Sequence, residues 1–286
     1  MGEKQIKIVR TVREMQDLSD QFRREGKVIG VVPTMGFLHE GHLSLIRAAR
    51  ERADVVAVSI FVNPAQFGPG EDFEWYPRDF ERDERLVRKT GGDVIFNPSA
   101  DEMYPEEYLT SVHVDTITTV LCGASRPGHF QGVTTVCAKL FHAVKPHFAV
   151  FGQKDAQQVA VIRRMVKDLN FDLDIVVCPI VREADGLAMS SRNVYLSPEE
   201  REDALSLSQS LRMVEEAIQA GERSSSVLIQ TMRDHILSKT RTRIDYVAIV
   251  HPETLEPLET ITERTLVAIA VFVGKTRLID NVLVEV

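Results

Sequence analysis

The sequence has few cysteines and no cysteine motif. Only three occur among its 286 residues, Cys122, Cys137 and Cys178, and no two of them are spaced as a CxxC pair. An odd number cannot form a complete disulfide framework, and isolated cysteines do not build the usual zinc sites. We therefore expect reduced thiols in an intracellular protein.

Long apolar runs and an excess of basic residues are also absent. No segment approaches the roughly 20 apolar residues that span a bilayer, and the first ten residues, MGEKQIKIVR, have no apolar core of signal-peptide length. The formal net charge is −8, whereas nucleic-acid-binding domains usually carry a basic face. We therefore expect a cytoplasmic enzyme that binds neither membranes nor nucleic acids.

What the sequence does contain is a strand–turn–helix pattern at residues 28–50, VIGVVPTMGFLHEGHLSLIRAAR. Its β-branched residues predict a buried parallel strand, and Pro33 is expected to end that strand because proline cannot continue the ladder. A helix is predicted to begin near residues 40–42, with Leu45, Ile46 and Ala49 on its buried face. A second apolar strand at residues 54–62 completes a β-α-β unit, which favours a parallel sheet.

Two histidines, His39 and His42, lie three residues apart at the start of this helix, so they can face one side. A helix N-terminus offers free N–H groups and a partial positive charge to an anion. The pattern therefore favours phosphate binding over a packed turn histidine. A zinc site is the alternative, but no third ligand has suitable spacing nearby.

Three later loops place polar side chains after predicted strands, at the edge where open parallel sheets bind ligands. Gln66 can recognise a hydroxyl or carboxylate, or it is simply an exposed loop residue. Lys154 follows a strand at residues 148–151 and suits a phosphate, whereas Asp155 is expected to cap the next helix. Residues 190–192, Ser-Ser-Arg, either close on a triphosphate or cap a helix.

Two further stretches are less specific. Residues 122–133, CGASRPGHFQGV, predict a shaped loop before a helix at residues 134–144. In that loop Arg126 and His129 either bring positive charge toward a phosphate or form a structural turn. The run of mixed charge at residues 71–88 is interpreted for the most part as a solvated helix face.

The order of elements predicts an α/β protein with two domains. Residues 1–183 alternate strands and helices, which is typical of a Rossmann-like parallel sheet. From Ser197 the pattern changes to two helices, the first with a proline at its first position, followed by two or three strands. Residues 184–286 are therefore expected to form a smaller α+β domain that covers the first as a lid or wall.

Five blocks carry a family resemblance: PTMGFLHEGH at residues 33–42, FVNPAQF at 61–67, RPGHFQGV at 126–133, DGLAMSSRN at 185–193 and RLIDN at 277–281. In this order they resemble the pantothenate synthetase (pantoate–β-alanine ligase) family, over essentially the whole chain. The HxGH element alone marks a wider superfamily of nucleotidyl-transferring folds. The resemblance implies ATP-dependent condensation of (R)-pantoate with β-alanine to pantothenate, AMP and diphosphate, through a pantoyl-adenylate intermediate. It also implies Mg²⁺ with the ATP, no tightly bound organic cofactor, and a cytoplasmic homodimer.

The resemblance also assigns roles to single residues. His42 occupies the position of the proton donor. Charge moves onto the phosphates during adenylation, and His39, His42, Lys154 and Arg192 are the cationic or donor groups able to neutralise it. The positions that contact ATP are Met35, Gly36, Phe37, Leu38, His39, Glu40, Gly41, His42, Gly152, Gln153, Lys154, Asp155, Val181, Met189, Ser190, Ser191 and Arg192.

Two glutamines correspond to the pantoate-binding positions, Gln66 and Gln158, and Gln66 also lies next to the β-alanine site. Gln153 departs from the family, in which many members carry glutamate. The neutral amide removes one charge near the nucleotide, which we do not expect to abolish activity. The sequence does not indicate the Mg²⁺ ligands.

Two other functions share the HxGH turn. A nucleotidyltransferase would move AMP to a phosphate acceptor and would release no free AMP when β-alanine is added. A regulatory module would bind ATP without releasing pyrophosphate. The paired glutamines and the set of phosphate-facing residues argue against the regulatory module.

Overall fold

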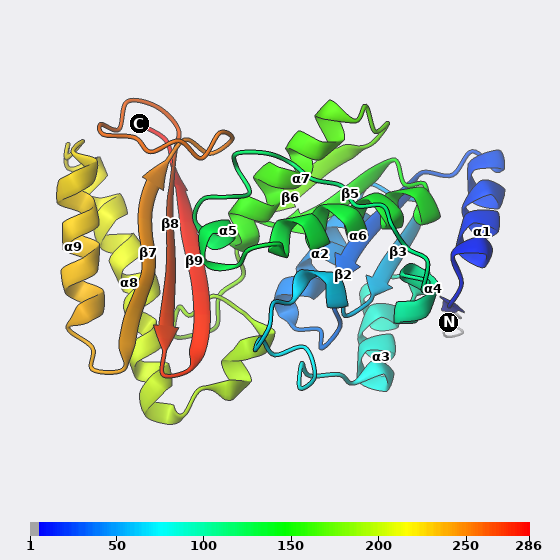
Figure 1. The fold of residues 1–286 in the computed structure, drawn as a ribbon, viewed down its shortest axis with the longest axis horizontal. Coiled ribbons are helices and arrows are strands. Elements are labelled where there is room, and N and C mark those ends of the chain that lie inside the picture. Colours follow the sequence, from blue (N-terminus) through cyan, green and yellow to red (C-terminus); the bar gives the residue numbers. More distant parts are fainter. Residues whose placement is uncertain (1–5) are drawn as a thin grey trace.

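The computed structural model describes residues 6–286. Its larger part is a wholly parallel sheet with the strand order β1-β4-β3-β2-β5-β6 (Figure 1). The strands are β1 (Lys7–Val9), β2 (Ile29–Thr34), β3 (Val55–Ile60), β4 (Val94–Phe96), β5 (Phe148–Gly152) and β6 (Asp174–Cys178). The predicted α/β class and the Rossmann-like parallel sheet are confirmed.

Helices cover both faces of this sheet (Figure 1). One face packs against α1 (Val12–Arg24), α6 (His129–Val144) and α7 (Ala156–Asp168), and the other against α2 (Glu40–Arg50) and α3 (Phe80–Thr90). Because neighbouring residues of a strand point to opposite faces, Val31 belongs to the first core and Val32 to the second. The sheet is therefore buried on both sides, as its continuous apolar strands predict.

The C-terminal part is a three-stranded antiparallel sheet with two helices. It comprises α8 (Pro198–Gln219), α9 (Ser225–Leu237), β7 (Thr242–Val250), β8 (Thr265–Val273) and β9 (Thr276–Val284). Ser197 and Glu200 form a capping box at the start of α8, which fixes the predicted helix start. One face of the small sheet packs on α8 and α9, whereas Leu266 and Ala268 on the other face join the core that holds α6 and α7.

The strand order places a topological switch point between β2 and β5. The chain passes from β2 through α2 to β3 on one side, and β5 lies on the other side of β2. Ligands of open α/β sheets bind at such a point, beyond the carboxyl ends of the strands. His39 follows β2, His42 lies in the first turn of α2, and Lys154 follows β5, so the predicted anion-binding residues lie at this position.

Two predicted boundaries are wrong. Pro33 does not end β2, because β2 pairs with β5 only at Gly30 and Val31, so the missing N–H of Pro33 costs no bond on that side. Helix α6 begins at His129 rather than at residue 134. Gly128 turns the chain into the helix at a φ of 82°, and Phe130 is already buried in the core that α6 shares with α1 and α7.

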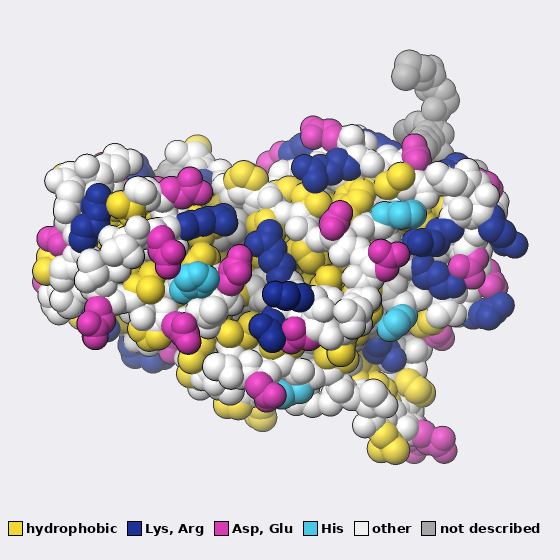
Figure 2. Space-filling model, turned by 90° about the horizontal axis from the view of Figure 1, so that it is seen from above, with side chains coloured by type: hydrophobic (Ala, Val, Ile, Leu, Met, Phe, Trp, Pro, Cys, Tyr) yellow, Lys and Arg dark blue, Asp and Glu magenta, His cyan; other side chains and the backbone are white. Residues whose placement is uncertain are grey.

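On the face of the molecule in Figure 2, basic and acidic side chains are interspersed over most of the surface, and several basic side chains lie close together near the middle of the view. Among residues 6–286 no helix has both the length and the apolar character needed to cross a bilayer.

Gly132 fixes the contact between α6 and the short 3₁₀ helix η1 (Pro64–Gln66). A Cβ at this position would lie 2.2 Å from the Ala65 carbonyl oxygen and 2.6 Å from the Gln66 nitrogen. Both are backbone atoms and cannot rotate away, so η1 would have to shift.

We expect Gly132→Ala to lower the free energy of unfolding by about 1–3 kcal/mol, the usual cost of overpacking. Urea denaturation of the purified variant measures this loss. Gly68→Ala is the matched control, since its Cβ would meet only the Glu71 side chain at 3.8 Å. Equal stabilities of the two variants would contradict the prediction.

Candidate active site

A buried carboxylate holds the turn between β2 and α2. Asp83, on α3, accepts hydrogen bonds from the backbone N–H groups of Phe37, at 2.7 Å, and Leu38, at 2.8 Å. Gly36 and Phe37 both have positive φ angles, so the turn is unusual backbone that needs such support. Asp83 is only 1% exposed, so the interpretation of the 71–88 run as a solvated face is wrong for this residue.

The two histidine rings lie against each other, tilted by 38°, and both are neutral at neutral pH. Their ring centroids are 4.0 Å apart, and the backbone N–H of His39 donates to Nδ1 of His42 at 3.3 Å. This bond leaves the proton of His42 on Nε2. Burial and the neighbouring His39 and Lys154 hold the pKa of His42 well below 6.5. At neutral pH the pair therefore supplies N–H dipoles to an anion rather than positive charge.

His39 has an unused ring nitrogen. Its Nδ1 is buried and has no hydrogen-bond partner among the residues that the structure describes. Burial is the largest cause that lowers the pKa of His39 from 6.5 to about 4, followed by the charge of Lys154. A buried polar atom without a partner is uncommon in a folded protein and is consistent with a position that a ligand completes.

The loop after β5 is held by the C-terminal strand β9. The side chain of Gln153 donates to Asn281 at 3.0 Å, and the Asn281 amide donates to the carbonyl oxygens of Gln153, at 3.0 Å, and Lys154, at 2.9 Å. Asn281 belongs to the RLIDN block, to which sequence reasoning assigned no role. Asp155 precedes α7 as predicted, but its side chain makes no capping bond.

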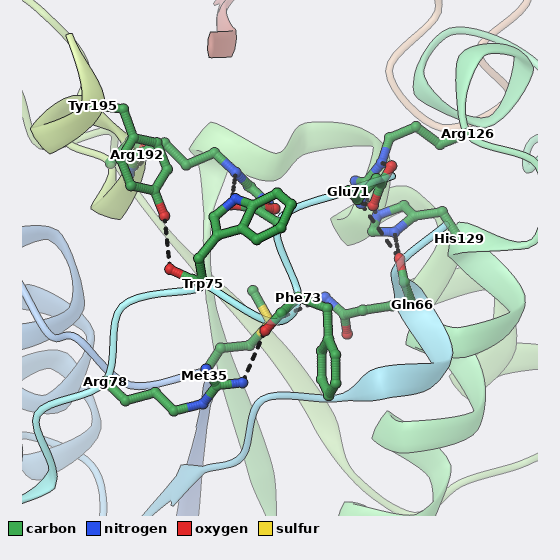
Figure 3. A network of polar contacts seen from close by, with 12 residues as sticks. Met35, Gln66, Glu71, Phe73, Trp75, Arg78, Arg126, His129, Arg192 and Tyr195 are labelled. Atoms are coloured by element: carbon green, nitrogen blue, oxygen red, sulfur yellow. Dashed lines mark hydrogen bonds and ion pairs between the residues drawn. The ribbon is translucent and has the colours of Figure 1, made fainter. Parts of the chain in front are cut away.

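The loop of residues 190–192 contacts the β2–α2 turn, and the carboxylate of Asp72 holds it in place. Ser191 donates to the Phe37 carbonyl at 3.4 Å, which joins this loop to the β2–α2 turn. Arg192 donates to both oxygens of Asp72, at 2.9 and 2.8 Å, beside Tyr195 and Trp75 in Figure 3. Ser190 accepts from the N–H of Arg192 at 3.3 Å and caps the short 3₁₀ helix η3 (Ser191–Tyr195), as the helix-cap interpretation predicts for one of the two serines. The backbone of Met189 pairs with Val181 at 3.0 Å, which places these two predicted residues together.

The glutamines differ in their roles. Gln66 accepts from Asn63 at 3.0 Å and its amide lies 3.3 Å from the Met35 sulfur. Gln157 is buried and bonds to the backbone of Ile117, Val120 and Cys122. Gln158 is half-buried, lines a cavity and makes no side-chain hydrogen bond to another residue within 6–286. The neighbouring Gln157 is therefore a structural residue, and Gln158 is the one available to a ligand.

A cavity of about 90 Å³ lies between the two parts of the chain. Its lining includes Lys154, Asp155, Gln158, Ser190 and Arg192 from the predicted set, and Arg126, His129, Arg277 and Asn281 beside them. The residues of the β2–α2 turn and Gln66 do not line it directly. A larger groove of about 920 Å³ runs along α7 and β6, but of the predicted residues it contains only Gln153. We therefore place the site at the smaller cavity.

The family model for pantoate–β-alanine ligase matches residues 7–283. The chain belongs to the pantoate–β-alanine ligase family. Pantothenate synthetase of Thermotoga petrophila is 58% identical over 276 residues, which cover 96% of this chain and 99% of that protein. Pantothenate synthetase of Thermoanaerobacter sp. is 59% identical over 272 residues, covering 95% and 96%.

Solved structures agree with this assignment. Pantothenate synthetase of Thermus thermophilus superposes with a TM-score of 0.92 at 46% identity, covering 97% of this chain and 99% of that one. Pantoate–β-alanine ligase of Francisella tularensis, complexed with beta-gamma ATP and β-alanine, gives 0.79 at 34% identity and covers 98% of both chains. This member of the ligase family is therefore an enzyme that joins pantoate to β-alanine with the use of ATP.

The depressed pKa of His39 predicts a pH-dependent stability. Between about 4 and 6.5 the unfolded chain binds more protons at this residue than the folded chain. The free energy of unfolding therefore falls as pH falls through this window. We expect His39→Asn, which cannot gain the proton, to show a shallower fall than the unmodified protein in urea denaturation from pH 7 to pH 4.

The matched control is His113→Asn, because the His113 side chain is 52% exposed. This variant is expected to follow the pH dependence of the unmodified protein. A fall as steep in His39→Asn as in the control would show that His39 is not held neutral by burial.

Proposed function

We propose that the cavity and the adjoining β2–α2 turn form an adenylation site that makes pantothenate through pantoyl adenylate. Lys154 and Gln158, from the segment after β5, and Ser190 and Arg192, from a later loop, line one cavity, and this observation carries the proposal. Membership of the family establishes the ligase reaction. The pantoyl-adenylate intermediate and the role of each residue are proposed.

The chemistry explains why ATP is used. A carboxylate reacts poorly with an amine because oxide is a poor leaving group. In the proposed first step a pantoate carboxylate oxygen attacks the α-phosphorus of ATP, and the bond to the β-phosphate bridging oxygen breaks to release pyrophosphate. In the second step the β-alanine amine attacks the acyl carbon, AMP leaves, and the amine loses a proton.

The nucleotide is proposed to contact the turn of residues 35–42, Gly152 to Asp155, Val181 and residues 189–192. Within this turn the N–H groups of Phe37 and Leu38 are taken by Asp83, and that of His39 by His42. Phosphate oxygens are therefore proposed to contact the next N–H groups, of Glu40 and Gly41, because the first turn of a helix leaves its N–H groups without intrahelical partners. The neutral His42 offers its Nε2–H to charge that develops on the phosphates, and this dipole needs no reorganisation during the reaction. His39 lies against it and can contribute in the same way.

Lys154 and Arg192 are proposed to carry the positive charge of the site. Arg192 is paired with Asp72 in this structure, so the triphosphate has to replace that carboxylate. A bidentate guanidinium suits phosphate as well as carboxylate, which makes such an exchange chemically simple. Sequence reasoning missed Asp72, which lies within the run of mixed charge.

Pantoate is proposed to bind between Gln66 and Gln158, with β-alanine next to Gln66. An amide can both donate to a carboxylate and accept from a hydroxyl, which suits a hydroxy acid. Gln158 has no competing side-chain bond within residues 6–286, and Gln66 is held by Asn63.

Magnesium is proposed to enter with ATP and to neutralise part of its phosphate charge. Among the described residues no group of three His, Cys, Asp or Glu side chains is placed to hold a metal. This fits Mg²⁺, which commonly keeps waters and takes phosphate oxygens as ligands. The proposed reaction requires no tightly bound organic cofactor.

The architecture is proposed to be two domains, residues 1–183 and 184–286, with the second acting as a lid. A separate core of α8, α9 and the small sheet supports this division, and the bonds of Asn281 to the loop after β5 connect the two. The family resemblance supports a cytoplasmic homodimer that binds small molecules and neither nucleic acid nor membrane.

Pantoate-dependent exchange between ATP and radiolabelled pyrophosphate, without β-alanine, tests the adenylate. We expect exchange by the unmodified protein and a decrease on the order of 100-fold or more in His42→Ala, since loss of one such donor typically costs about 2.7–4 kcal/mol. His142→Ala, at an exposed position of α6, is the matched control and should exchange normally. Absence of exchange in the unmodified protein would contradict the intermediate, and normal exchange in His42→Ala would contradict the role of His42.

The proposed role of Gln66 has a separate test. We expect Gln66→Ala to raise the KM for pantoate on the order of 10-fold, from the loss of about one hydrogen bond to substrate, while the KM for ATP changes little. Steady-state kinetics with each substrate varied in turn measures both values. An unchanged KM for pantoate would remove Gln66 from the pantoate site.

A further inference from the structure

His129 uses both ring nitrogens inside the protein. Its Nδ1 lies 2.8 Å from the backbone carbonyl oxygen of Gln66, and its Nε2 lies 3.0 Å from a terminal guanidinium nitrogen of Arg126 (Figure 3). A guanidinium can only donate, so Nε2 accepts and the proton is on Nδ1, from where it is donated to Gln66. No ring N–H of His129 is left for a substrate, although the residue lines the cavity.

Arg126 is fixed from its other side by Glu71. The guanidinium donates to both carboxylate oxygens of Glu71, at 2.7 and 2.6 Å, and both side chains are largely buried, at 16% and 25% exposed. Bidentate pairs of this kind have a fixed geometry. The positive charge of Arg126 is therefore already paired with a carboxylate in this structure, and the neutral His129 brings no charge of its own.

The segment that receives the His129 bond is the short helix η1, which ends at Gln66. The backbone of the same segment packs closely on Gly132, one turn further along α6. Next to it, the Asn63 amide donates to the Gly132 carbonyl at 3.1 Å. Helix α6 thus contacts η1 at two successive turns. The His129 bond lies at the residue whose side chain is proposed to bind pantoate.

We propose that His129 is a positioning residue for pantoate. By holding the main chain of Gln66 it sets the direction of the Gln66 side chain. Glu71 and Arg126 in turn keep the imidazole of His129 in the tautomer that this bond requires. The inference rests on the proposed role of Gln66. It extends the pantoate site to three residues that make no contact with pantoate themselves. Burial, followed by the charge of Arg126, lowers the pKa of His129 to about 4, so this tautomer persists across neutral pH.

Two substitutions distinguish the contributions of the two ring nitrogens of His129. The amide of asparagine reproduces the position of Nδ1, whereas that of glutamine reproduces Nε2. We expect His129→Asn to keep the KM for pantoate within about 2-fold, because the bond to Gln66 is retained. His129→Gln should raise this KM on the order of 10-fold, the effect of about one lost hydrogen bond, with the KM for ATP within about 2-fold.

A double-substitution cycle tests whether His129 acts through Gln66. In a Gln66→Ala background, His129→Gln should add no further increase in the KM for pantoate, because residues of one network are not additive. Additive effects, an unchanged KM in His129→Gln alone, or equal losses in the Asn and Gln variants would each overturn the inference. If His129→Gln does not fold, Glu71→Ala provides the same test at the far end of the network, and an unchanged KM for pantoate there would also overturn it.

The two proposals fail in different ways. A normal KM for pantoate in Gln66→Ala overturns the role of Gln66 and the inference with it. A raised KM in Gln66→Ala together with a normal KM in His129→Gln overturns the inference alone.

Discussion

The site depends on one buried carboxylate. Asp83 accepts hydrogen bonds from two backbone N–H groups of the β2–α2 turn, at Phe37 and Leu38, and Gly36 and Phe37 of this turn have positive φ angles. A turn of this conformation is costly by itself, and the two bonds to a buried acid offset that cost. Burial is also the main cause that raises the pKa of Asp83. The position of His39 and His42 follows from this turn, because α2 begins immediately after it.

Carboxylates also hold Arg126 and Arg192, two of the arginines that line the cavity. Glu71 and Asp72 are adjacent in sequence, yet they pair with Arg126 and Arg192, which come from different parts of the chain. One short acidic segment therefore spans the two sides of the site (Figure 3). The pairs keep the guanidinium groups neutralised and oriented before substrate arrives. Only Arg192 has a proposed ligand that can replace its acid, whereas Arg126 is part of the support for Gln66.

The loop after β5, which carries Lys154, also makes a contact between the two parts of the chain. Asn281 makes three hydrogen bonds to the loop that contains Gln153 and Lys154. Because Gln153 uses its side-chain amide for this contact, its replacement of the glutamate common in the family is compatible with the structure. The C-terminal strand β9 thus supports the backbone on which Lys154 is carried, in addition to its place in the small sheet.

The sequence by itself determined the elements whose causes are local. The apolar strands around the switch point, the capped start of α8 and the position of α2 depend on neighbouring residues, and the structure confirms them. The five sequence blocks also determined the family and the reaction. Tertiary structure decided which acids accompany the predicted cations, which of Gln157 and Gln158 is structural, and that the two histidines are neutral. These features depend on burial and on partners distant in the chain, and neither follows from residue spacing.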